Sequence, residues 1–192
     1  MPAVATLVWN PANTITVVRI LLVPLVVGAL VVDTAGGWRL VATGLFALAA
    51  ASDRLDGYLA RRMNQVTDWG KLVDPIADKL LMGASLVTLS FLVDLPWWVT
   101  VVILVREIGV TVMRFAVLLY AVIPASGGGK LKTVLQSVWI GLFILPLGWL
   151  PGWMTTVSWV IMLVAVALTV ITGFDYVRRV WAVRRDALGD VR

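Results

Sequence analysis

Long apolar stretches alternate with short polar turns along the whole chain, and this pattern predicts a helical membrane protein. A helix that crosses a bilayer needs about 20 mostly apolar residues, and six stretches approach or exceed that length. The predicted spans cover residues 14–32, 38–62, 71–93, 97–123, 130–150 and 154–183. A short lead precedes the first span and a basic tail follows the last. We therefore expect one six-helix transmembrane domain over residues 1–192, with the first apolar run retained as a helix because no small-residue cleavage site follows it.

Composition supports the membrane assignment and narrows the chemistry. Hydrophobic residues make up 60% of the chain, above the share typical of soluble domains. Neither cysteine nor histidine occurs, which excludes thiol chemistry, disulfides and a histidine base. Any metal site must therefore be built from carboxylates, which favour hard cations such as Mg²⁺. The net charge of +5 does not call for a nucleic-acid partner, since loops on the cytoplasmic side of membrane proteins collect Lys and Arg.

Basic residues gather on one side of the predicted topology. That side carries Arg61, Arg62, Lys71, Lys130, Lys132, Arg178, Arg179, Arg184, Arg185 and Arg192. The other side has only Arg39, with Asp33 and Asp94 nearby. The positive-inside rule then predicts a multi-pass protein of the cytoplasmic (inner) membrane with both termini in the cytoplasm. We expect the tail arginines to anchor the chain to anionic lipid.

Four aspartates follow the pattern D-x2-D-G-x2-A-R-x8-G-x3-D-x3-D across the second and third spans, at Asp53, Asp56, Asp74 and Asp78. Their spacing puts each pair on one helical face, and the short connector makes the two helices antiparallel neighbours. Carboxylates at membrane depth need compensating charge, and a divalent cation is the natural candidate. Gly57, Ala60 and Gly70 would leave a slot beside them, with Arg61 at its rim. Such a metal could clamp a diphosphate, leaving one Asp as a base. The alternative is that the aspartates only pair with Arg54, Arg61, Arg62 and Lys79.

This stretch resembles the signature of the CDP-alcohol phosphotransferases, and all eight fixed positions match. The resemblance implies a six-span membrane enzyme that displaces CMP from a CDP-linked lipid or alcohol. It implies that Asp53, Asp56, Asp74 and Asp78 bind Mg²⁺, or Mn²⁺, and that Asp78 is also the general base. It places the CDP moiety against Asp56, Gly57, Ala60, Arg61 and Gly70. A homodimer is expected by analogy with the family only.

Similarity to the phosphatidylglycerophosphate synthases of that family extends beyond the signature. It covers residues 13–20 with Pro24, residues 61–65, residues 74–79, Arg106-Glu107-Ile108 with Arg114, and residues 129–133 with Gln136. Those enzymes use CDP-diacylglycerol as donor and sn-glycerol 3-phosphate as acceptor. The chain departs from them in its N-terminal lead and in the glycine loop at residues 127–129, which bears on how the acceptor fits.

A phosphorylated acceptor also suits the charges of the fourth and fifth spans, because a phosphate dianion needs several cationic donors. Candidates are Arg106, Arg114, Lys130 and Lys132. The alternatives are that Arg106 pairs with Glu107, although neighbours on a helix point apart, and that the two lysines only set topology. Further ligand contacts are possible at Asn13, Thr16 and Arg19; Asn13 is also a candidate helix cap, and Arg19 could either balance the aspartates or hold a phosphate.

Rival functions remain open from sequence alone. Within the family the acceptor could be inositol phosphate, with phosphatidylserine or cardiolipin formation further off. A cation or metabolite transporter would also place acids in the membrane, but we find no internal repeat, and the acids gather at one surface. A structural scaffold would leave the spacing of the acids unexplained.

Overall fold

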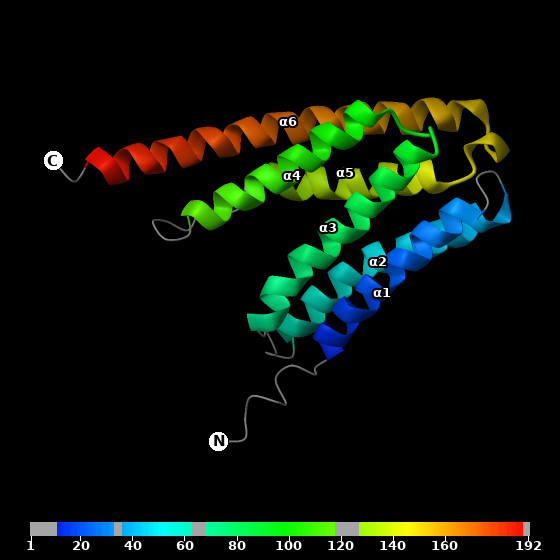
Figure 1. The fold of residues 1–192 in the computed structure, drawn as a ribbon, viewed down its shortest axis with the longest axis horizontal. Coiled ribbons are helices and arrows are strands. Elements are labelled where there is room, and N and C mark those ends of the chain that lie inside the picture. The colour runs from blue at the N-terminus through cyan, green and yellow to red at the C-terminus, as the bar shows by residue number, and fades with distance from the viewer. Residues whose placement is uncertain (1–10, 33–35, 63–67, 118–126, 190–192) are drawn as a thin grey trace, which may run out of the picture.

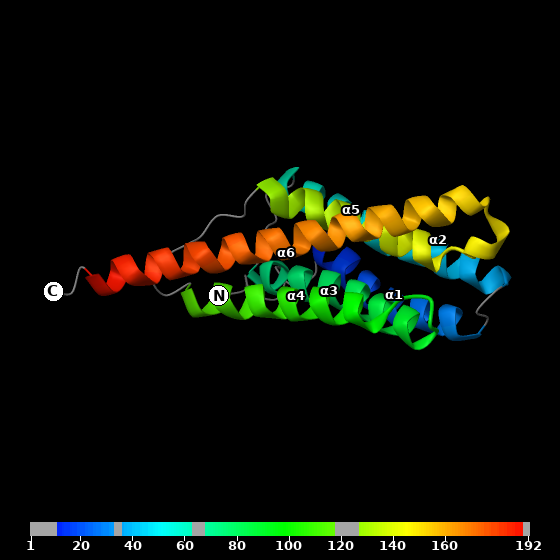
Figure 2. The ribbon, with the colours of Figure 1, turned by 90° about the horizontal axis from the view of Figure 1, so that it is seen from above.

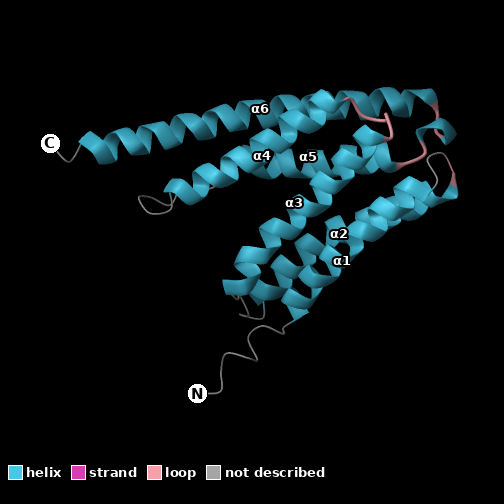
Figure 3. Cartoon of the chain, viewed as in Figure 1, coloured by secondary structure: helices cyan, strands magenta, loops and turns pink. Residues whose placement is uncertain are grey.

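The computed structural model describes residues 11–32, 36–62, 68–117 and 127–189, and all statements below concern these residues. They form six α-helices and one short 3₁₀ turn. The elements are α1 (Pro11–Val32), α2 (Gly37–Arg62), α3 (Asp68–Phe91), α4 (Trp97–Val117), α5 (Gly127–Ile144), η1 (Leu147–Trp149) and α6 (Gly152–Gly189). Figure 3 shows that helix dominates the described chain.

Successive helices run back and forth, so that alternate helix ends gather at the same end of the bundle (Figure 1). The start of α1, the end of α2 and the start of α3 lie together there, and α1 packs on both α2 and α3. The second group consists of α4 and α5, which pack on α6. Helix α6 has 38 residues, or about 57 Å at 1.5 Å per residue, and it extends past the other helices toward the C-terminus (Figure 2).

The predicted spans are confirmed as helices, but several boundaries were wrong. Helix α3 already begins at Asp68, and α5 includes the three glycines that we expected in a loop. Helix α5 stops at Ile144 and not at residue 150 because Pro146 cannot continue the hydrogen-bond ladder. Helix α6 ends at Gly189, six residues beyond the predicted 183, so much of the basic tail is helical. Helix α4 is described only to Val117, and residues 118–123 of its predicted span lie outside the described residues.

A tight turn ends α3 two residues earlier than predicted. Val93 adopts a left-handed conformation with φ of 63°, which is uncommon for a β-branched residue. The turn is closed because the amides of Asp94 and Leu95 both donate to the Leu89 carbonyl, at 3.0 and 3.2 Å. These bonds satisfy a carbonyl that the end of the helix would otherwise leave without a partner. The turn reverses the chain directly into α4.

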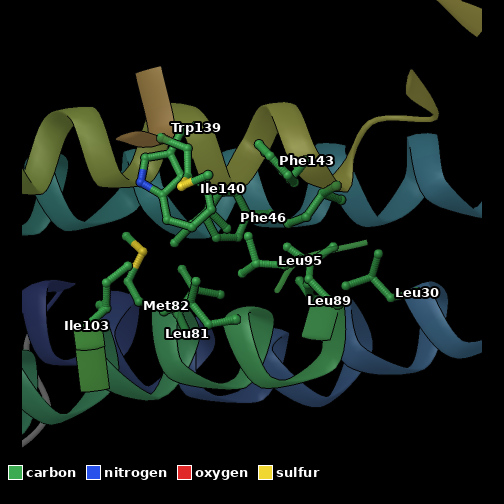
Figure 4. Close-up of a cluster of buried hydrophobic side chains, with 14 of the residues drawn as sticks. Leu30, Phe46, Leu81, Met82, Leu89, Leu95, Ile103, Trp139, Ile140 and Phe143 are labelled. Atoms are coloured by element: carbon green, nitrogen blue, oxygen red, sulfur yellow. The ribbon is translucent and has the colours of Figure 1, made fainter. Parts of the chain in front are cut away.

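The core lies where α2, α3 and α5 face one another. Figure 4 shows Trp139, Ile140 and Phe143 of α5 meeting Leu81 and Leu89 of α3, all of them buried. The Trp139 and Phe143 rings make an edge-to-face contact with centroids 5.5 Å apart, a favoured geometry for aromatic pairs. This interior holds the two helix groups together.

The outward faces are apolar instead of polar. On α4 an exposed stripe recurs at helical spacing at Trp97, Val101, Val105, Ile108 and Val112. Contiguous apolar surface of this kind is rare on soluble monomers and marks contact with another apolar phase. Among the described residues, two segments are long and apolar enough to cross a membrane, Asn13–Val32 and Gly152–Ala182, with shorter apolar helices at Gly37–Ser52 and Leu131–Ile144.

An ion pair joins two elements at the end of the bundle away from the acidic motif. Arg39 Nη2, near the start of α2, donates to Asp94 Oδ2 in the α3–α4 turn. The Arg39 side chain is only 6% exposed, whereas Asp94 is 32% exposed. Removing the carboxylate therefore leaves a buried charge without compensation, which costs more than the pair contributes.

We expect Asp94→Asn to lower the free energy of unfolding by about 3 kcal/mol, because it leaves the buried Arg39 charge without its carboxylate. Thermal unfolding of the purified protein in detergent measures the change. The matched control is Asp175→Asn, which breaks an exposed pair with Arg179 within α6 and should cost less than about 1 kcal/mol. Equal losses in the two variants would show that the Arg39–Asp94 pair does not stabilise the fold.

Candidate functional site

The acidic motif occupies the end of α2 and the start of α3, which lie at the same end of the bundle (Figure 1). Asp53, Asp56, Gly57, Ala60 and Arg61 fall in the last ten residues of α2, and Gly70, Asp74 and Asp78 in the first eleven of α3. The Asp78 side chain is half-buried. The side chains of the other seven residues lie outside the described part of the structure, so their contacts stay a prediction.

The donor set of this segment fits a hard divalent cation. Two pairs of aspartates, spaced i, i+3 on α2 and i, i+4 on α3, are carried by helices that pack against each other. Side chains at these spacings share a face, and carboxylate oxygens are the ligands that Mg²⁺ prefers. The backbone arrangement therefore allows one cation to be held between α2 and α3.

A buried polar face of α1 lies beside this segment. Asn13, Thr16 and Arg19 are spaced three apart and are all buried, Arg19 completely. Arg19 Nε donates to Ser52 Oγ at 3.4 Å, and Ser52 immediately precedes Asp53 in the sequence. Asn13 is the third residue of α1, so the helix-cap interpretation of this residue was wrong. The structure thus brings Arg19 to the start of the acidic motif.

A second charged cluster joins α4, α5 and α6. Glu107 Oε1 accepts a hydrogen bond from Arg106 Nη1 at 3.1 Å and another from Lys132 Nζ. Arg106 Nη2 donates to Thr172 Oγ1 of α6 at 3.1 Å. The side chains of Arg106 and Lys132 are 16% and 4% exposed. One carboxylate therefore holds two poorly solvated cations, and the trio keeps a net charge of one positive unit.

Polar contacts also connect this cluster to the acidic helix α3. Lys79 Nζ donates to Thr111 Oγ1 of α4, and the Thr111 hydroxyl donates in turn to the Glu107 carbonyl at 2.7 Å. The Lys132 ammonium, which contacts Glu107, is also within reach of the charges of Arg106, Asp78 and Lys79. Asp78 thus lies within electrostatic reach of Lys132, and α3 connects the acidic motif to the charged cluster.

The predicted cations are only partly placed. The structure brings together Arg106 and Lys132, whereas Arg114 and Lys130 lie on α4 and α5 with side chains outside the described part. The alternative that Arg106 pairs with Glu107 is realised as a contact, and the expectation that their side chains point apart was wrong. The reason is that both side chains are flexible, so the Arg106 guanidinium can reach the carboxylate of the neighbouring Glu107.

Sequence reasoning missed several members of the site. Thr111, Thr172 and Gly173 were read as ordinary parts of apolar spans, and Ser52 was given no role. A threonine followed by glycine inside an otherwise apolar run is a usable signal, because small and hydroxylated residues mark close contacts between membrane helices. The partner of such a pair, however, depends on how the helices pack.

Comparison with known proteins adds an independent line of information. Residues 9–171 match the sequence model of the CDP-alcohol phosphatidyltransferase family. The chain is 53% identical over 174 residues to a probable phosphatidylglycerophosphate synthase of Mycobacterium tuberculosis, covering 88% of this chain and 81% of the relative. It is 36% identical over 169 residues to a CDP-diacylglycerol–glycerol-3-phosphate 3-phosphatidyltransferase of Rickettsia felis (87% and 93% covered). A Bacillus subtilis protein of the same name is 32% identical over 197 residues (90% and 96% covered).

Proposed function

The chain belongs to the CDP-alcohol phosphatidyltransferase family, and from this premise we propose that it makes phosphatidylglycerophosphate and CMP from CDP-diacylglycerol and sn-glycerol 3-phosphate. It is an integral membrane protein, as the family and its long apolar helices indicate. We propose further that all six helices cross the cytoplasmic membrane and that the site opens to the cytoplasm, where a soluble phosphorylated acceptor would be met.

The observation that carries the choice of acceptor is the pair of buried cations on one carboxylate. Arg106 and Lys132 both donate to the Glu107 carboxylate in a poorly solvated place, so the formal charge of these three residues is one positive unit. Burying a net charge is costly unless a counter-charge binds, and the phosphate of glycerol 3-phosphate supplies one. An uncharged acceptor such as glycerol or inositol would leave that cost in place.

In the proposed site each half binds one substrate. Asp53, Asp56, Asp74 and Asp78 would hold Mg²⁺, which when bound neutralises charge on the donor diphosphate. The CDP moiety would bind against Asp56, Gly57, Ala60, Arg61 and Gly70. Arg106 and Lys132, together with Arg114 and Lys130, would bind the acceptor phosphate. The acyl chains of the donor would stay in the bilayer, beside the apolar outer faces of the helices.

Asp78 is the proposed general base, since it lies within electrostatic reach of Lys132. An acceptor whose phosphate binds Lys132 would present its primary hydroxyl on the side of α3. Asp78 would take the hydroxyl proton as the oxygen attacks the lipid-side phosphorus. The new bond joins that oxygen to the phosphatidyl phosphorus, the bond from this phosphorus to the bridging oxygen of the diphosphate breaks, and CMP leaves. Fixing both substrates around one phosphorus supplies much of the rate.

An acceptor panel tests this function directly. Purified protein in detergent micelles with labelled CDP-diacylglycerol and Mg²⁺ is expected to release CMP and form phosphatidylglycerophosphate with glycerol 3-phosphate. Glycerol is the matched control that lacks only the phosphate, and its kcat/KM should be at least about 1,000-fold lower because it offers no anion to the two buried cations. Faster turnover with inositol phosphate would replace the acceptor, and no CMP release with any acceptor would overturn the enzymatic assignment.

A further inference from the structure

The two cations of the acceptor site are held by three residues that have no assigned role. We propose that Glu107, Thr172 and Gly173 are positioning residues, which keep Arg106 and Lys132 side by side so that one phosphate group binds both. This inference rests on the proposed function, since it takes these cations to be the acceptor-phosphate site. None of the three residues is expected to touch the reacting phosphorus.

Glu107 is needed because two positive charges repel each other strongly where water is scarce. Lys132 is almost completely buried, and Arg106 is largely so. Without a carboxylate between them, Lys132 would lose its proton or turn away, since an unpaired buried ammonium is unstable. Glu107 contacts both cations through one oxygen, and its single negative charge offsets only one of their two positive charges. The carboxylate therefore lets Arg106 and Lys132 lie close together while the cluster still attracts an anion.

Thr172 fixes the far side of the Arg106 guanidinium. Its hydroxyl accepts from Arg106 Nη2 at 3.1 Å and donates to the Leu168 carbonyl one turn earlier on α6, at 2.7 Å. That second bond holds the hydroxyl rotamer, so the oxygen presents a lone pair to α4. Arg106 is thus bound at one nitrogen by α6 and at another by Glu107.

Gly173 provides the space in which Arg106 lies. A Cβ built at this position would be 3.1 Å from Arg106 Cγ and 3.6 Å from Nε. The Arg106 stem therefore runs against the backbone of α6, where no side chain would fit without moving it. Residues i and i+1 of a helix point about 100° apart, and the Arg106 side chain that contacts Glu107 does so while its stem lies against Gly173. The same conformation of the Arg106 side chain is therefore favoured by Gly173, Thr172 and Glu107.

Glu107→Gln tests the central claim, because glutamine keeps the size of the side chain and removes its charge. We expect the KM for glycerol 3-phosphate to rise about tenfold, the effect of losing hydrogen bonds to charged groups. The expected change in kcat is less than about threefold, and the KM for CDP-diacylglycerol should stay the same, since remote positioning affects one substrate. Glu107→Asp, which restores the charge, should recover most of the affinity.

Two matched pairs of variants test the α6 residues. Thr172→Val removes the bond to Arg106, whereas Thr169→Val removes a hydroxyl that bonds only to the Ala165 carbonyl of its own helix. Gly173→Ala crowds Arg106, whereas Gly44→Ala adds a methyl group where nothing lies within 4 Å. Thr172→Val and Gly173→Ala are each expected to raise the KM for glycerol 3-phosphate by roughly fivefold, the effect of one modest interaction. Both control variants should behave as the wild type.

Lys132→Met separates failure of this inference from failure of the proposed function. If Lys132 binds the acceptor phosphate, this variant raises the KM for glycerol 3-phosphate by about 100-fold, as expected for a lost phosphate contact; an unchanged KM would overturn the acceptor site itself. If Lys132→Met has that effect but Glu107→Gln leaves the KM unchanged or lowers it, only the positioning role fails. A loss of thermal stability with equal effects on both substrates would make Glu107 merely structural.

Discussion

Asp78→Asn is expected to abolish phosphatidyl transfer, with kcat at least about 1,000-fold lower, while CDP-diacylglycerol still binds. The substitution keeps the shape of the side chain and removes its capacity to take a proton, and general-base catalysis alone is worth about 10²–10⁴ in rate. Loss of one metal ligand adds to this effect. Turnover with saturating substrates and equilibrium binding of CDP-diacylglycerol are the two measurements, made on the same purified protein.

A metal titration separates the two roles that we propose for Asp78. If the residue were only a ligand, excess Mg²⁺ would restore the activity of Asp78→Asn by mass action. If it is also the base, kcat should stay low at every Mg²⁺ concentration. Asp175→Asn is the control, because Asp175 is exposed and pairs only with Arg179 one turn along α6, and its activity should stay within about twofold of wild type, as for a surface site. More than a tenth of wild-type activity in Asp78→Asn would remove Asp78 from the base role.

The sequence predicted the helices well because apolar length and polar turns are local properties. The ends of α3 and α5 were harder to predict. Val93 takes a left-handed conformation that valine does not favour, and Pro146 stops α5 within a stretch that reads as apolar throughout. The extension of α6 was missed because arginines signal the end of a membrane span, not the end of a helix. Hydropathy predicts the boundaries of an apolar span, whereas the backbone hydrogen bonds determine the residue at which a helix ends.

The candidate site was likewise predictable from the sequence only in part. The residues of the acidic motif lie close together in the sequence, so their spacing could be interpreted without knowledge of the fold. The cation cluster depends on residues 25 and 66 positions apart, Glu107 with Lys132 and Arg106 with Thr172. Nothing in the local pattern of α6 shows that Thr172 and Gly173 face Arg106, because that contact is produced by packing. The charged residues of the site could therefore be proposed from the sequence. The side chains that contact and orient them could not be proposed, because those contacts depend on how the helices pack.

The other large effect that we expect comes from removing divalent cations. Four aspartates are predicted to face one another at the junction of α2 and α3, and like charges at such distances repel strongly where solvent is limited. With EDTA the enzyme should lose turnover almost completely, because the donor diphosphate would meet carboxylates without an intervening positive charge. Adding Mg²⁺ in excess should restore it, and Mn²⁺, which takes similar oxygen ligands, should restore it in part.

Thermal unfolding provides a readout of the same site that does not depend on catalysis. A ligand that binds only the folded state stabilises it by about 2.7 kcal/mol at 100 times its Kd, so Mg²⁺ should raise the Tm of the wild type by several degrees. This increase should disappear in Asp74→Asn, which removes one proposed ligand, and should persist in Asp175→Asn. Activity that survives exhaustive chelation would contradict a metal-dependent reaction. An equal rise in Tm in wild type and Asp74→Asn would instead place the cation away from the α2–α3 junction, since the stabilisation must follow the residues that hold the ion.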